Sequence, residues 1–209
     1  MKFIGTLLLI ALFAQSSLAQ KSISPYEWNW TRDGIWTGAA FAATYGGVKI
    51  ISNKEGFSET ELADMRANID GINFIDKWAA GNYSESANGI SDIPFFISFA
   101  TPVILLFDDE VNDHTAQVLG LYIESLATTS ALFTITAGLT NRGRPYTYGT
   151  DAPLSRRMSI TATRSFYSGH VAATATASFF AAKVYQDFNP DSPAIPYVWA
   201  GAAVLPAMV

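Results

Sequence analysis

The chain has 209 residues, of which 49% are hydrophobic and 15% charged, and its formal net charge is −5. Soluble domains average about 25% charged residues, so this chain must bury a large apolar core, contact a membrane, or do both. The negative charge argues against a nucleic-acid partner, because nucleic acids are bound by basic surfaces. The chain has no cysteine, which excludes disulfides and thiolate metal sites.

The first residues predict export. A positive start precedes an apolar run at residues 3–13, and Ser17 and Ala19 place small side chains before a cleavage site. The run is shorter than the roughly 20 apolar residues that span a bilayer, so a cleaved signal is favoured over a retained membrane anchor. We expect residues 1–19 to be a signal peptide and residues 20–209 to be one domain. The mature protein should lie in the periplasm or cell envelope, where it has access to a membrane surface.

Apolar residues at helical spacing, with glycine and proline between them, divide the mature chain into helices and loops. Ser58 and Glu61 have the spacing of a capping box, which marks the start of a helix. The apolar run at residues 93–107 contains Pro94 and Pro102. The other stretches that we expect to be helical are residues 35–52, 58–70, 74–80, 114–139, 169–187 and 197–209.

The segments between these helices are polar. We expect an irregular arm at residues 20–34, a loop at 81–91, a solvated acidic turn rather than a cation site at 108–113, and irregular chain at 141–155. Strand signals are poor. The sequence therefore predicts an all-α fold, a single bundle of about six helices.

A membrane-spanning protein is the less favoured interpretation. The apolar stretches at residues 35–52 and 93–107 are short, and the one at 114–139 contains Glu124. The mean hydropathy of +0.19 is modest for an integral membrane enzyme. We therefore favour a soluble or peripheral protein. Glu124 needs a partner if it is buried, and we expect that partner to be an arginine of the anion site described next.

Two short motifs suggest chemistry. Arg142-Gly143-Arg144-Pro145 follows the longest helix, and Ser168-Gly169-His170 begins the alanine-rich one. A helix start offers free backbone N–H groups and a positive dipole end, so Ser168 and Gly169 can bind an anion. His170 can release a proton near neutral pH. Arg144 adds a guanidinium that holds phosphate through parallel hydrogen bonds. Each motif alone is better explained as a helix cap or a solvated arginine, whereas together they predict a phosphate site.

The two motifs resemble those of the type 2 phosphatidic acid phosphatase and vanadium haloperoxidase superfamily. That superfamily carries Lys, six residues, Arg-Pro; then Pro-Ser-Gly-His; then Ser-Arg, five residues, His, three residues, Asp. Arg144-Pro145 is similar to the end of the first motif, and Tyr167-Ser168-Gly169-His170 to the second, with Tyr167 in place of proline. The resemblance covers roughly residues 70–209.

The resemblance implies site roles. Arg144 and the amides of Ser168 and Gly169 would bind phosphate, and His170 would protonate the leaving oxygen. A second histidine would attack phosphorus and form a phospho-histidine that water hydrolyses. The resemblance implies no metal and no cofactor. The implied function is an exported phosphatase that hydrolyses phosphomonoesters or lipid phosphates.

The chain departs from the superfamily pattern at two places. Ala137 stands where the lysine of the first motif is expected, and we expect Arg142 or Arg164 to supply the missing charge. No histidine follows His170, so the third motif is absent, and His114 is expected to be a surface residue rather than a substitute nucleophile. Because the last helix has no capping residue, we expect the bundle to be incomplete at its C-terminus and to be part of a longer reading frame.

Two other functions stay open. A chain without the third motif is also consistent with a non-catalytic remnant that binds phosphate or only packs in the envelope. A vanadate-dependent haloperoxidase would use the same pocket, and peroxidase activity that appears only with added vanadate would identify it.

Overall fold

The computed structural model describes residues 23–209, so the predicted signal peptide lies outside the described residues. This part of the chain forms nine α-helices joined by loops and 3-10 turns, and it contains no β-strand. The predicted all-α bundle is thereby confirmed. The α-helices are α2 (Trp30–Ser52), α3 (Glu59–Ala67), α4 (Phe74–Lys77), α5 (Glu85–Ile104), α6 (Asp109–Asn112), α7 (Thr115–Leu139), α8 (Leu154–Arg157), α9 (Gly169–Phe188) and α10 (Ile195–Ala207). The 3-10 turns are η1 (Ile69–Gly71), η2 (Leu105–Phe107), η3 (Pro145–Tyr148) and η4 (Ile160–Thr163).

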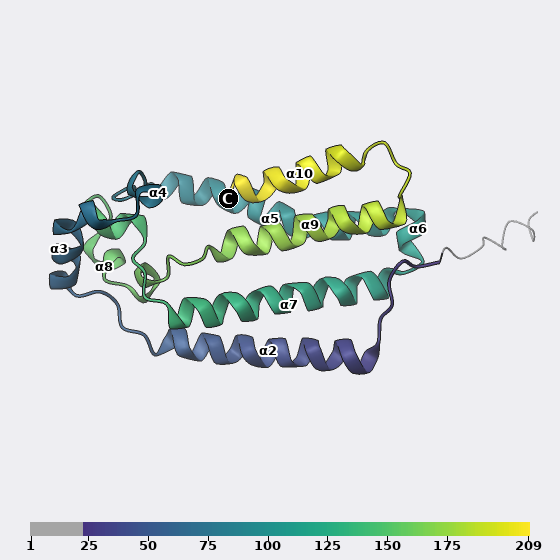
Figure 1. Ribbon diagram of the computed structural model, residues 1–209, viewed down its shortest axis with the longest axis horizontal. Helices are drawn as coiled ribbons and strands as arrows, with labels where there is room; N and C mark the ends of the chain where they lie inside the picture. Colours follow the sequence, from purple (N-terminus) through teal and green to yellow (C-terminus); the bar gives the residue numbers. More distant parts are fainter. Residues whose placement is uncertain (1–22) are drawn as a thin grey trace, which may run out of the picture.

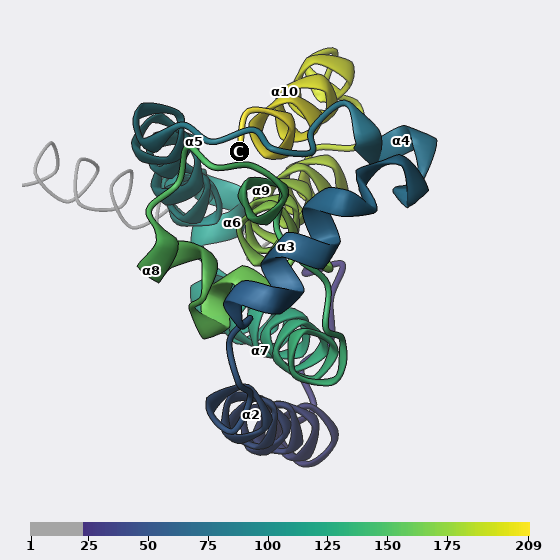
Figure 2. The same ribbon diagram turned by 90° about the vertical axis from the view of Figure 1, so that its left-hand side faces the viewer.

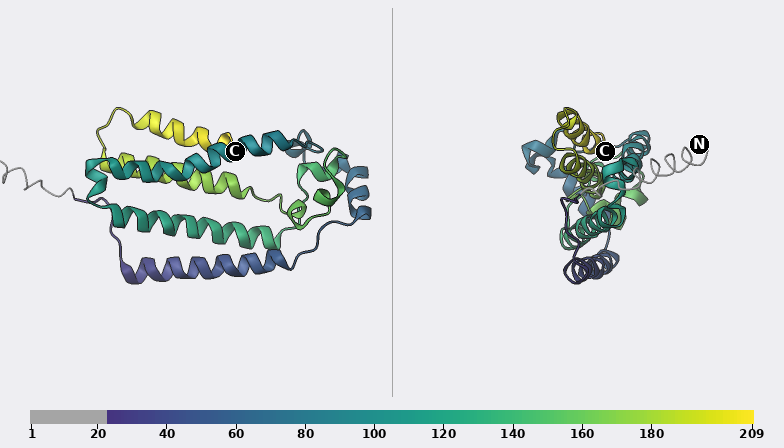
Figure 3. Two further views of the ribbon diagram at one scale, coloured as in Figure 1. Left: turned by 180° about the vertical axis from the view of Figure 1, so that it is seen from behind. Right: turned by 90° about the vertical axis from the view of Figure 1, so that its right-hand side faces the viewer.

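The long helices α2, α5, α7, α9 and α10 lie along the long axis of the molecule (Figure 1). Helix α9 packs against α5, α7 and α10, and α2 packs on the outer side of α7 (Figure 2). The short helices α3, α4 and α8 gather at one end of the bundle, and α6 lies at the other (Figure 3). We call these the α8 end and the α6 end.

Local sequence signals predict several helix ends correctly. Ser58 and Glu61 form the predicted capping box at the start of α3, with both reciprocal hydrogen bonds present. Helix α7 matches its predicted range within one residue, as does α9, because each combines an apolar periodic stretch with polar or glycine-rich sequence at its ends.

Three segments that were expected to be loops or turns are partly helical. The acidic turn at residues 108–113 contains α6, because the Asp108 side chain caps it by accepting the amide of Glu110 at 3.0 Å.

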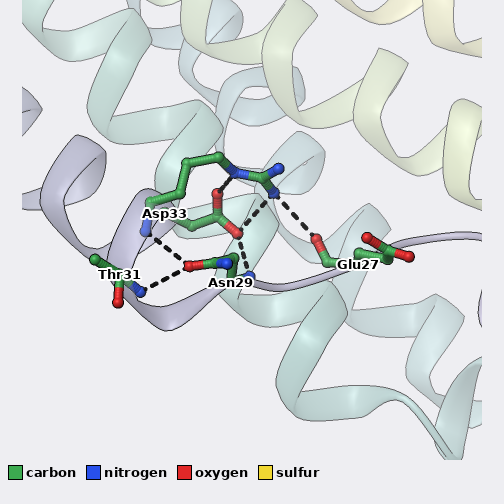
Figure 4. Close-up of polar contacts among 5 residues, drawn as sticks. Glu27, Asn29, Thr31 and Asp33 are labelled. Carbon is green, nitrogen blue, oxygen red and sulfur yellow. Dashed lines mark hydrogen bonds and ion pairs between the residues drawn. The ribbon is translucent and has the colours of Figure 1, made fainter.

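Helix α2 begins at Trp30 rather than at residue 35. The Asn29 side chain caps it there by accepting hydrogen bonds from the amides of Thr31 and Arg32 at 3.0 and 2.9 Å. The Asp33 carboxylate accepts the Asn29 amide at 2.7 Å and closes the cap (Figure 4). The prediction of an irregular arm as far as residue 34 is therefore wrong.

Helix α5 likewise begins earlier than expected, at Glu85. Ser84 caps it by accepting the amide of Ala87 at 3.2 Å, so most of the loop expected at residues 81–91 is the polar first part of a helix. The helix continues through Pro94 and Pro102. A proline removes one backbone hydrogen bond and need not end a helix that is packed on its neighbours.

Large apolar side chains cover much of the outer surface of the bundle. On α5 and the turn that follows it, Phe96 is 67% exposed and Phe107 is 85% exposed, and Trp30 at the start of α2 is 81% exposed. Two segments, Glu85–Phe107 and Thr115–Leu139, are long and apolar enough to cross a membrane. These segments are compatible with association with a membrane.

Small residues allow α2 to approach α7 closely. Ala40, Ala127 and Ala131 are buried in this contact, and Gly47 faces the backbone of α7. A Cβ atom at Gly47 would lie 2.6 Å from the carbonyl carbon of Thr134 and 2.4 Å from its hydroxyl oxygen. A side chain at this position must therefore push the two helices apart.

The Gly47→Ala variant should be less stable than the wild type by about 1–3 kcal/mol, because overpacking forces backbone shifts. Gly46→Ala is the matched control. A Cβ atom at Gly46 meets no atom within 4 Å, so alanine there should raise helix stability by up to about 1 kcal/mol. Thermal unfolding followed by circular dichroism measures both. Equal midpoints for the two variants would contradict this account of the α2–α7 contact.

Candidate functional site

Backbone hydrogen bonds hold the two motifs side by side. The amide of Arg142 donates to the carbonyl of Thr163 at 3.0 Å, and the amide of Ser165 donates back to the carbonyl of Arg142 at 3.0 Å. The amide of Arg144 donates to the carbonyl of Ala162 at 2.9 Å. The segment after α7 (residues 140–144, the first linker) thus pairs with the segment before α9 (residues 162–168, the second linker).

An open cavity of about 550 Å³ lies at the α8 end, where these linkers meet α5 and the start of α9. The first linker contributes Arg144 to its wall, and helix α5 contributes Asp92 and Phe95. The residues from the second linker and α9 that bear on its chemistry are Arg164, Ser168, Gly169 and His170.

Arg144 is a half-buried cation that no carboxylate pairs with in the described part of the chain. Its guanidinium forms no ion pair and no hydrogen bond within residues 23–209. Burial lowers the pKa of Arg144, and the positive charges of Arg164 and Arg156 lower it further. A desolvated charge is costly unless an opposite charge compensates it, so this side of the cavity is suited to hold an anion.

Arg164 brings a second guanidinium to the cavity. Its Nη2 donates to the hydroxyl of Thr161 at 3.0 Å, and its Nε is buried without a hydrogen-bond partner. A buried N–H group that lacks an acceptor costs free energy. An anion in the cavity would compensate the positive charges of both Arg164 and Arg144.

The start of α9 supplies backbone donors. Ser168 is the N-cap, and its hydroxyl oxygen accepts the amide of Val171 at 3.3 Å. The amides of Gly169 and His170 donate to no backbone carbonyl in the described part of the chain. Glycine at position 169 has a steric reason as well, because a Cβ atom there would lie 2.8 Å from the ring of Phe133. The Phe133 ring therefore limits how closely the start of α9 approaches α7.

His170 is held at the cavity wall by two α5 residues. Its ring lies 4.4 Å from the ring of Phe95, between centroids, and its Nε2 lies 3.9 Å from a carboxylate oxygen of Asp92. The latter distance is too long for a hydrogen bond, so Asp92 is a charged neighbour of His170 and not its hydrogen-bond partner. Asp92 was not expected at the site because it precedes the predicted helical stretch at residues 93–107, and the contact of Phe95 with His170 depends on how α5 packs against α9.

The structure brings four of the five predicted site residues together and separates the fifth. Arg144, Ser168, Gly169 and His170 share the cavity. Arg142 forms an ion pair with Asp76 and lines a different cavity of about 680 Å³. Of the two arginines proposed to replace the lysine expected at Ala137, Arg164 is the one at the site.

An ammonium group does reach Ala137, but it comes from Lys54 and contacts backbone. The Lys54 Nζ donates to the carbonyls of Ala137 and Thr140 at 3.1 and 2.5 Å, and so caps the C-terminus of α7. Burial, together with the charge of Arg164, lowers the pKa of Lys54.

Two other polar residues lie away from the site. His114 precedes α7 at the α6 end and lies 5.7 Å from the ring of Phe188. The expectation that Glu124 pairs with an arginine of the site is wrong. Its charged neighbours are Arg32 and Asp33, which belong to the start of α2.

Comparisons of the chain with models of protein families, with curated proteins and with solved structures find no match. Any function is therefore inferred from the residues and their geometry.

Removing the uncompensated cation should weaken anion binding. In Arg144→Ala, the dissociation constant for inorganic phosphate should rise roughly 10- to 100-fold, since a hydrogen bond to a charged group contributes about 1.5–3 kcal/mol. Arg142→Ala is the matched control, because it removes the same charge two residues away and outside the cavity. Isothermal titration calorimetry measures both variants. Equal weakening by the two substitutions would show that Arg144 has no special contact with phosphate.

Proposed function

We propose that this protein is a phosphatase of the cell envelope that hydrolyses phosphomonoesters or lipid phosphates. The proposal depends above all on Arg144, a half-buried guanidinium that forms no ion pair within residues 23–209 and lies in the same cavity as the open helix start at Gly169 and the imidazole of His170. Two guanidinium groups and two backbone amides match a phosphate dianion in charge and in donors.

In the proposed reaction, the ester P–O bond breaks while the phosphoryl group moves to a nucleophile. Loose phosphoryl transition states gain most from positioned positive charge, which Arg144, Arg164 and the helix start supply. His170 gives its proton to the leaving oxygen, and the Asp92 carboxylate lies beside its ring. The resulting alcohol leaves first, and water then releases phosphate from the nucleophile.

The nucleophile is the part of this scheme that the cavity residues do not supply. The resemblance assigns the attack to a second histidine. The chain has two histidines, and His114 lies at the α6 end, away from the cavity. We therefore expect the 209 residues by themselves to bind phosphate and to turn over little substrate. The same observation favours a second candidate function, a phosphate-binding protein without catalysis.

We propose that the long helices of the bundle lie in a lipid bilayer. Residues 34–48 of α2, 93–107 of α5 and its following turn, and 125–139 of α7 contain no charged side chain. At 1.5 Å per helical residue, each such stretch is about 22 Å long, compared with roughly 30 Å for the hydrocarbon core of a bilayer. The exposed aromatic and aliphatic side chains on these helices support a position in lipid. The cavity, at one end of the bundle, would then face a headgroup layer.

His170→Ala should abolish whatever phosphate release the wild type shows and spare phosphate binding. Loss of a general acid costs roughly 10²- to 10⁴-fold in rate, so release from an aryl phosphate should fall to background. His114→Ala is the control and should match the wild type. A rate that is unchanged in His170→Ala would remove His170 from the mechanism. Tight phosphate binding without release by the wild type would favour the non-catalytic protein.

Residues 20–209 should associate with lipid vesicles and resist extraction. After mixing with phosphatidylcholine vesicles and flotation through a density gradient, the protein should stay in the lipid fraction through an alkaline carbonate wash. Phe96→Lys together with Ile104→Lys should weaken this association, because a charge in the hydrocarbon core costs several kcal/mol. A wild-type protein that is a soluble monomer without detergent would contradict a position in the bilayer.

A further inference from the structure

Lysine and arginine residues gather at the α8 end of the bundle. Within residues 23–209, nine of the eleven lysines and arginines lie in the ranges 49–77 and 142–164, which join the long helices at that end. The other two, Arg32 in the first turn of α2 and Lys183 near the end of α9, belong to the α6 end. Seven remain at the α8 end when Arg144 and Arg164, which line the phosphate cavity, are left out. The anion site therefore does not by itself explain this distribution.

The segments that join the long helices are short at both ends (Figure 1). They are residues 53–84 and 140–168 at the α8 end, and residues 105–114 and 189–194 at the α6 end. In membrane proteins, loops shorter than about 60 residues that are rich in lysine and arginine stay on the cytoplasmic side, and acidic residues have little influence on orientation. With the long helices in a bilayer, as proposed above, this rule places the α8 end in the cytoplasm.

The first described residues lie at the opposite end of the bundle. The Tyr26 hydroxyl donates to the carboxylate of Asp187, at the end of α9, at 2.6 Å. The Ser24 hydroxyl donates to the side chain of Gln117, in the first turn of α7, at 2.5 Å. The predicted signal peptide would carry the segment that follows it across the membrane, and that segment leads into these contacts. The expected export of the N-terminus and the distribution of basic residues thus give the same orientation, with the α6 end outside.

Exposed aromatic side chains mark both ends of the apolar region. Trp30 in the first turn of α2 and Tyr197 in the first turn of α10 are exposed at the α6 end, and Trp78, directly after α4, is exposed at the α8 end. Tryptophan and tyrosine are enriched at both interfaces between lipid and water. Each end of the bundle is therefore suited to lie in a headgroup layer, as an orientation across the membrane requires.

We propose that the bundle crosses the cytoplasmic membrane with its α8 end, and hence the phosphate cavity, on the cytoplasmic side. This inference rests on the bilayer position that is part of the proposed function. Helix α2 would cross from outside to inside, α5 would return, and α7 would bring the chain back to the cytoplasmic side before Arg142. The protein would then be held in the envelope by its own helices, and its site would take phosphate esters from the cytoplasmic side.

Lys49 is suited to stabilise this orientation. It lies exposed in the last turn of α2, its ammonium is 5.6 Å from the centre of the Tyr45 ring, and no carboxylate within residues 23–209 forms an ion pair with it. The cytoplasmic leaflet carries anionic lipids that attract basic side chains near the membrane surface. An anionic headgroup would supply the partner that Lys49 lacks among the described residues.

The chain has no cysteine, so a single introduced cysteine can report the side on which each end lies. Ala67→Cys, in the last turn of α3, marks the α8 end, and Ala116→Cys, in the first turn of α7, marks the α6 end. Both alanines are exposed. The full chain with one cysteine is expressed in bacteria, and spheroplasts are treated with a membrane-impermeant maleimide. Ala116→Cys should be labelled at once, whereas Ala67→Cys should be labelled only after the cells are broken. Labelling of both variants in detergent is the control for access to each thiol in the folded protein.

The other three labelling patterns would overturn the orientation, and each identifies a different error. Labelling of Ala67→Cys with protection of Ala116→Cys reverses the orientation and leaves the bilayer position standing. Labelling of both in intact spheroplasts shows an exported protein that does not cross the membrane, which refutes the bilayer position as well. Protection of both shows a chain that stays inside the cell, which refutes the predicted export. Calorimetric titration of the purified protein with inorganic phosphate tests the anion site separately, because orientation does not affect it.

Discussion

The pairing of the two linkers is the constraint on which the site depends. Arg144 and His170 are far apart along the chain, and each belongs to the end of a different helix. The hydrogen bonds from Arg142 to Thr163, and from Ser165 back to Arg142, bring those helix ends together. These hydrogen bonds join backbone groups, so the pairing of the linkers does not use their side chains. The arginines are then free to face the cavity instead of holding the fold together.

The basic residues near the site fall into two groups: those whose charge is bound by other protein groups, and those that face the cavity. Lys54, Arg142 and Arg157 are satisfied by protein groups: two carbonyls at the end of α7, the Asp76 carboxylate, and the carbonyls of Ala152 and Gly149. Arg144 and Arg164 retain donors that no group within residues 23–209 accepts. A protein that leaves buried cations unmatched is less stable for it, and an anionic ligand would recover that free energy on binding.

The sequence predicted those features that depend on local patterns. The ends of α7 and α9, the Ser58 capping box and the meeting of the two motifs follow from periodicity, cap residues and motif order. The roles of Arg142 and Arg164 were not predictable, because the choice depends on Asp76, which comes from α4. Phe95 lies in a stretch that was expected to be helical, but its contact with His170 depends on how α5 packs against α9. Asp92 was missed because it stands just before that stretch. The first two turns of α5 are polar, so no apolar periodicity marks them as helix.

Helix α2 lies on the outside of the bundle, yet its end is tied to the site through Lys54. The ammonium holds the carbonyls of Ala137 and Thr140, and the first linker starts at that point. A displacement of α2 by its surroundings would therefore also displace the backbone that leads to Arg144. The outermost helix is thus connected to the anion site in two ways, by its packing along α7 and by the hydrogen bonds of Lys54.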